Sequence, residues 1–79
     1  MNAPEQAVAR ILIVEDEPAH AEAMEEGLAR LGHQCTTIHD GAAAVAKIQN
    51  QAFDIIVTDL VLGDGPDGLA VLAAAREHA

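Results

Sequence analysis

Short apolar runs alternate along the chain with segments of helical periodicity. Residues 10–14 (RILIV) and 53–58 (FDIIVT) are nearly continuous in apolar character, which is typical of strands buried on both faces. Between them, residues 34–39 are rich in β-branched side chains, which also favour a strand. The pattern therefore predicts strands at 10–14, 34–39 and 53–58.

Each predicted strand is followed by a segment that favours a helix. Pro18 suits the first turn of a helix that Gly32 would end, and Asp40 suits the N-cap of a short helix over 41–49. After a loop at 60–66, Asp67 can cap a last helix over 68–77. The residues that recur at helical spacing in the first helix are His20, Met24, Leu28 and Leu31. Those expected to point inward from the second helix are Val45 and Ile48, and those sharing one face of the last helix are Leu69, Leu72 and Ala73.

Strands without polar alternation, separated by helices, predict an α/β fold with a doubly wound parallel sheet. We expect residues 1–9 to form a flexible leader and residues 10–79 to form a single domain. Ligand sites in such sheets lie beyond the carboxyl ends of the strands. The residues that follow the predicted strands are therefore the first place to look for function.

Composition excludes several classes of partner. Thirteen acidic residues against four basic ones give a net charge of −9, and Phe53 is the only aromatic residue. Direct binding to nucleic acid or to an anionic membrane is therefore disfavoured. Cys35 has no second cysteine to pair with, and no apolar run approaches the roughly 20 residues that span a bilayer. Residues 1–10 lack an apolar signal core, so we expect a cytoplasmic location.

Acidic residues follow two of the three predicted strands. Glu15 and Asp16 come directly after the first strand, and Asp59 comes directly after the third. Neighbouring parallel strands lie about 4.8 Å apart, so these carboxylates are expected to converge at one edge of the sheet. Mg²⁺ prefers such hard oxygen ligands, and with the ion bound a carboxylate can attack a phosphoryl donor. The simpler interpretation is that each acid is only a polar residue at a strand end.

Three motifs resemble the receiver domain of two-component response regulators: ILIVEDEP at 11–18, FDIIVTDL at 53–60 and GPDGL at 65–69. The resemblance implies a flavodoxin-like sheet in which Glu15 and Asp16 hold Mg²⁺. It further implies that Asp59 accepts a phosphoryl group from a sensor histidine kinase or phosphotransfer protein, and that the backbone carbonyl of Val61 binds the metal.

The sequence departs from the family's pattern in three ways. Glu15 stands where the family more often has aspartate, and Gly63 replaces a proline in a loop one residue longer. The family has five strand–helix pairs, whereas this chain is expected to be a partial receiver domain that stops after the third pair. The family's Ser or Thr on strand 4 and Lys on strand 5 are then missing. The edge of the third strand would be open, and we expect the chain to be unstable or to form a homo-oligomer through it.

Two other functions remain open on the sequence. A receiver-like interaction module could keep the fold without phosphorylation. A Mg²⁺-dependent aspartyl phosphotransferase is less well supported, because such enzymes carry two acids two residues apart after the first strand. The four histidines, His20, His33, His39 and His78, show no metal-ligand spacing. We therefore expect a signalling module and not an enzyme.

Overall fold

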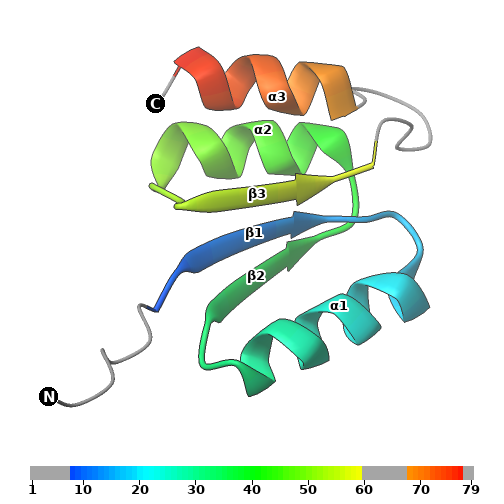
Figure 1. The fold of residues 1–79 in the computed structure, drawn as a ribbon. Helices are drawn as coiled ribbons and strands as arrows, with labels where there is room; N and C mark the ends of the chain where they lie inside the picture. The colour runs from blue at the N-terminus through cyan, green and yellow to red at the C-terminus, as the bar shows by residue number, and fades with distance from the viewer. Residues whose placement is uncertain (1–7, 60–67, 78–79) are drawn as a thin grey trace, which may run out of the picture.

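The computed structural model describes residues 8–59 and 68–77 and has the predicted order of elements (Figure 1). The elements are β1 (Arg10–Val14), α1 (Pro18–Arg30), β2 (Gln34–Ile38), α2 (Gly41–Asn50), β3 (Ile55–Thr58) and α3 (Gly68–Glu77). The predicted loop at 60–66, the predicted cap Asp67 and residues 1–7 of the predicted leader lie outside the described residues.

The strands form one parallel sheet in the order β2-β1-β3. Ile11 lies opposite Cys35 on one side and Ile55 on the other, and the register continues without a bulge to Val14. The third strand begins two residues later than predicted. The reason is that Asp54 turns its side chain onto the backbone: its Oδ2 accepts a hydrogen bond from the Arg10 amide at 2.8 Å.

The central strand, β1, is buried on both faces, as its continuous apolar character predicts. Residues 11–14 are all at most 2% exposed. Leu12 and Val14 pack into a core with α2 and α3, while Ile11 and Ile13 point to the opposite face by strand alternation. Figure 1 shows α1 on that opposite side and α2 and α3 together on the first. The doubly wound arrangement is therefore present.

Helix α1 contacts the sheet through a smaller residue than the pattern suggested. Ala21 is buried, whereas Met24 and Leu28 are half-buried and Leu31 is exposed. His20 belongs to the same predicted set but is exposed and lies at the carboxyl end of the strands. A small residue at the contact lets the helix lie close to the strands, so the longer side chains cover its margin. No helix within the described residues is long and apolar enough to cross a bilayer.

The predicted helix ends are confirmed at two positions. Gly32 has a φ of +91° just after α1, and its amide donates to the Ala29 carbonyl at 2.9 Å. At the start of α2, Asp40 Oδ1 accepts from the Ala43 amide at 2.8 Å. Both are the local conformations that these residue types favour at helix ends.

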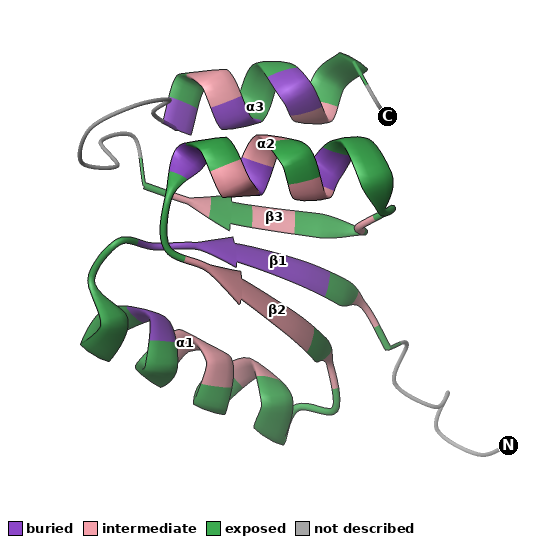
Figure 2. Cartoon of the chain, turned by 180° about the vertical axis from the view of Figure 1, so that it is seen from behind, coloured by how far each residue is buried: buried purple, intermediate pink, exposed green. Residues whose placement is uncertain are grey.

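The outer side of β3 and α3 is apolar and exposed. Helix α3 buries Gly68, Val71 and Ala74, and α2 buries Gly41, Ala44 and the predicted Ile48. Val45, also predicted to point inward, is half-buried and packs against the same core. The shared face of Leu69, Leu72 and Ala73 faces outward, with Leu69 64% exposed. Figure 2 shows this contrast between the buried β1 and the exposed flank of β3 and α3.

Candidate functional site

The acidic residues after β1 and β3 are held by backbone hydrogen bonds that extend the strand ladders. The Glu15 amide donates to the Ile38 carbonyl of β2 at 3.0 Å, and the Asp59 amide donates to the Val14 carbonyl of β1 at 3.3 Å. Glu15 and Asp59 are therefore fixed at the carboxyl edge of the sheet, each beside a neighbouring strand.

Three carboxylates meet at this edge. Glu15, Asp16 and Asp59 each offer an oxygen, and these oxygens all lie within 4.8 Å of one another. Glu15 is buried, whereas Asp16 and Asp59 are exposed. The side chains predicted from sequence to converge do so, and the cluster combines one enclosed oxygen donor with two that solvent or a partner can reach.

The proton affinity of Glu15 reflects opposing influences. The largest is the Glu17 amide, which donates to Glu15 Oε2 at 3.1 Å and lowers the pKa of Glu15. Burial and the neighbouring carboxyls of Asp59 and Asp16 act in the other direction, and together they hold the pKa of Glu15 above its ordinary value of 4.5. The cluster thus carries negative charge that is only partly compensated by the protein.

Two histidines border Glu15. His20 Nδ1 lies 3.9 Å from Glu15 Oε1, and His39 Nδ1 lies 3.0 Å from the Glu15 backbone carbonyl. The histidines are not spaced along the chain as metal ligands usually are, so spacing does not single these two out. The one available signal was position, because His39 directly follows β2 and His20 lies in the first turn of α1, both at the carboxyl edge.

One predicted ligand lies beyond the described part of the chain, and one strand residue lies at the margin of the site. Val61 is outside the described residues. Thr58 is half-buried in β3, and its hydroxyl donates to the Asp59 carbonyl at 2.9 Å. This side chain therefore binds the backbone next to the acid and not the carboxylate itself.

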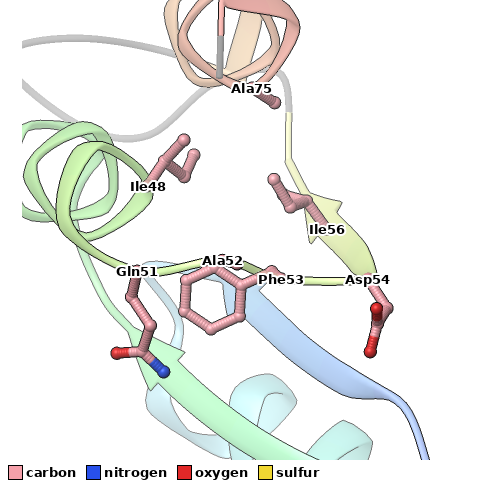
Figure 3. A pocket seen from close by; sticks show the side chains of 7 residues that line it. All are labelled: Ile48, Gln51, Ala52, Phe53, Asp54, Ile56 and Ala75. Atoms are coloured by element: carbon pink, nitrogen blue, oxygen red, sulfur yellow. The ribbon is translucent and has the colours of Figure 1, made fainter. Parts of the chain in front are cut away.

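A hollow of about 480 Å³ lies at the opposite end of the sheet (Figure 3). It is lined by Ile48, Gln51, Ala52, Phe53, Asp54, Ile56 and Ala75. Since residues 51–54 precede β3, this hollow is at the amino end of the strand. Its size does not make it the functional site, because the charged groups converge at the other edge.

The donor set fits a divalent cation. Hard carboxylate oxygens are the ligands that Mg²⁺ prefers, and a cation would compensate the charge that raises the pKa of Glu15. Glu15, Asp16 and Asp59 are the residues that would hold it.

A parallel doubly wound sheet with acids at the ends of adjacent strands defines a class of α/β module, and sequence comparison identifies the family. Residues 11–79 match the response regulator receiver domain, and the chain belongs to this family of two-component signalling modules. Domains of this family generally act as regulatory modules.

The curated relatives are regulators and a sensor kinase. The chain is 40% identical over 69 residues to the transcriptional regulatory protein TcrA of Mycobacterium tuberculosis, covering 87% of this chain and 27% of that protein. It is 36% identical over 50 residues to the sensor histidine kinase RcsC of Salmonella typhimurium, covering 63% of this chain and 5% of the kinase. The chain therefore spans about a quarter or less of these relatives.

A solved structure gives the same fold. The receiver domain of the sensor histidine kinase PA1611 from Pseudomonas aeruginosa, with Mg²⁺ coordinated in its active-site cleft, superimposes with a TM-score of 0.81 at 34% identity. The match covers 90% of this chain and 57% of that one. The predicted α/β receiver fold is thereby confirmed over the part that the two chains share.

Proposed function

We propose that this chain is a phosphoacceptor receiver module of a two-component phosphorelay, in which Asp59 receives a phosphoryl group from a sensor histidine kinase or phosphotransfer protein. The observation that carries the proposal is the convergence of Glu15, Asp16 and Asp59 within 4.8 Å in a member of the receiver family. The cytoplasm, where such kinases present their phosphohistidine, is the location this function requires.

The three acids have different roles in this proposal. Asp59 is exposed, so a donor can reach its carboxylate, and its backbone is fixed to β1 by the Asp59 amide. An Asp59 oxygen attacks the phosphorus, and the bond from phosphorus to the donor nitrogen breaks. Glu15 and Asp16 hold the cation from the β1 side, with Glu15 acting from an enclosed position. The backbone carbonyl of Val61 completes the set by family resemblance.

Bound Mg²⁺ would supply positive charge next to the transferring phosphoryl group. The protein's own contribution is positioning: the strand ladder sets the distance between Asp59 and Glu15, and the Glu17 amide fixes one oxygen of Glu15. The Mg²⁺ in the PA1611 receiver domain supports the assignment, since that domain shares this fold.

Intact mass after incubation with Mg²⁺ and a small-molecule phosphodonor such as acetyl phosphate tests the proposal. We expect the mass of one added phosphoryl group, lost when Asp59→Asn replaces the acceptor or when EDTA removes the metal. The matched control is Asp54→Asn, which changes an acid at the other end of β3. Labelling that survives Asp59→Asn would place the acceptor elsewhere.

A protein that binds Mg²⁺ through these acids yet takes up no phosphoryl group would favour the alternative, a receiver-like interaction module without phosphorylation. Asp16→Asn separates metal binding from the acceptor, because it removes one ligand charge and leaves Asp59 intact. We expect it to weaken Mg²⁺ binding with little effect on folding.

A further inference from the structure

His20 lies next to the carboxylates of Glu15, Asp16 and Asp59, but it is outside the two sequence motifs that contain these acids. Its Nδ1 is 3.9 Å from Glu15 Oε1, and its side chain is 73% exposed while that of Glu15 is 7% exposed. The imidazole therefore lies over the solvent side of an enclosed carboxylate.

The two oxygens of Glu15 have different surroundings. Oε2 accepts the Glu17 amide, whereas Oε1 is the oxygen that faces His20. Within the described part of the chain, no other group is paired with the His20 ring. A ring with this exposure can change its rotamer at little cost, since it has few packing contacts to lose.

The spacing suits two donors on one metal ion. Nitrogen and oxygen ligands lie about 2.0–2.2 Å from Zn²⁺ in tetrahedral sites, which puts neighbouring donors roughly 3.4 Å apart. His20 Nδ1 and Glu15 Oε1 exceed that separation by about half an ångström. A small rotation of the exposed ring would close the difference.

We propose that His20 is a cation-specificity residue: it adds a nitrogen donor beside Glu15, Asp16 and Asp59, so that the site binds a borderline transition-metal ion such as Co²⁺ or Zn²⁺ more tightly than Mg²⁺. This rests on the metal site of the proposed function. Imidazole suits Co²⁺ and Zn²⁺, whereas Mg²⁺ is served by carboxylate, carbonyl and water. Removing the imidazole should therefore weaken transition-metal binding selectively.

His39 provides a matched comparison within the same chain. It borders Glu15 too, but its Nδ1 is already paired with the Glu15 backbone carbonyl at 3.0 Å. A histidine that is near the site but engaged with backbone should contribute less to metal affinity than one that faces the carboxylate.

The test is calorimetric titration of the full chain, without a polyhistidine tag, with Co²⁺ and with Mg²⁺ at about pH 7.5. We expect His20→Ala to weaken Co²⁺ binding roughly 10-fold to 100-fold while the Mg²⁺ affinity changes by less than about twofold. The visible absorption band of bound Co²⁺ should shift as an oxygen replaces nitrogen in its coordination. Asp16→Asn should weaken the binding of both ions, which would show that they share one site. His20→Gln should repeat the result, and circular dichroism shows whether both variants keep the fold.

Three outcomes overturn the inference. One is a ratio of Co²⁺ to Mg²⁺ affinity unchanged by His20→Ala and His20→Gln, with Mg²⁺ binding still dependent on Asp16. In that case the proposed function stands and the role of His20 does not. Another is an equal loss of Co²⁺ affinity in His39→Gln, which would make proximity, not ligation, the cause. Absence of binding by either ion to the parent chain would reject the metal site and this inference together.

Discussion

Glu15 is the buried charged residue among the described residues, and its raised pKa has a consequence for stability. Because the folded state holds a proton on Glu15 at a higher pH than the unfolded chain, it binds more protons in the window between the two pKa values. The free energy of unfolding therefore falls as the pH rises from about the ordinary value of 4.5 through the raised folded-state pKa. Above this window and without metal, the ionised form of Glu15 is a net cost to the fold.

Replacing Glu15 by glutamine tests the direction of this pH dependence. In EDTA at neutral pH we expect Glu15→Gln to be more stable than the parent, because the substitution removes the enclosed charge and retains an oxygen for the Glu17 amide. The difference should shrink as the pH falls, since the parent becomes protonated. Urea denaturation at a series of pH values measures both effects.

In the presence of Mg²⁺ we expect the parent chain to be more stable than Glu15→Gln. A cation that binds the folded state stabilises it according to its concentration and affinity, and Glu15→Gln loses part of that gain. Glu22→Gln, at an exposed position on α1, serves as the comparison for removal of one charge. A Glu15→Gln protein less stable than the parent in EDTA would show that the carboxylate is satisfied by the protein alone.

At the scale of single elements, the start of α2 depends on one hydrogen bond. Asp40 Oδ1 accepts from the Ala43 amide at 2.8 Å, as an N-cap should. We expect Asp40→Ala to lower the free energy of unfolding by about 1 kcal/mol, within a usual range of about 0.5–2 kcal/mol. Urea denaturation at constant ionic strength measures the loss.

The control variant must also lose one negative charge. The chain has a net charge of −9, so removing any acidic residue reduces electrostatic repulsion in the folded state. Glu22→Ala removes the same charge from an exposed position on α1. Asp40→Ser should restore most of the stability, since serine also caps helices. Equal stability of Asp40→Ala and Asp40→Ser would mean that the cap contributes nothing measurable.

Elements of this kind could be predicted because their causes are local. Gly32 and Asp40 act on their own backbone neighbourhood, so residue type alone indicated both helix ends. The inward faces of the helices were harder to predict, since they depend on how closely each helix lies to the sheet. The burial of Ala21 on α1 and the outward face of Leu69 and Leu72 on α3 follow from that packing and not from periodicity.

The candidate site likewise has a part that could be predicted from the sequence and a part that depends on packing. Glu15, Asp16 and Asp59 were predictable, because parallel strands bring their carboxyl ends to one edge whatever the details of packing. The approach of His20 to Glu15 Oε1 was not, because it requires the direction in which α1 leaves the loop after β1.

For the whole molecule, the free edge of β3 is the feature with the largest expected effect. In the described residues, β3 pairs only with β1, and Ile55 is 47% exposed. An exposed apolar edge strand is a template for pairing with another chain. We expect the protein at high concentration to sediment as a dimer or larger assembly, more so as salt screens its negative charge.

Charged substitutions at the edge should break this association. Ile55→Lys or Val57→Lys should raise the dissociation constant by at least about tenfold, because pairing would bury the ammonium group. Leu31→Lys, at an exposed apolar position at the end of α1, is the matched control. Sedimentation velocity at moderate salt decides the matter, and a parent chain that stays monomeric at high concentration would contradict the expectation.

The position of β1 between two neighbours also determines how the backbone amides exchange with deuterated solvent. Each amide of a parallel strand donates to one neighbouring strand, and amides two residues apart share a side. The Ile13 amide therefore faces β2, as that of Glu15 does, and the Val57 amide faces β1, as that of Asp59 does. Amides of β3 have a free side and can exchange through local fraying. The protection of Ile13 should therefore report the opening of β1 from β2, while that of Val57 reports the opening of the β3 edge. The gap between these two opening free energies measures how far β3 fluctuates independently, and with it how often Asp59 moves away from Glu15 and Asp16.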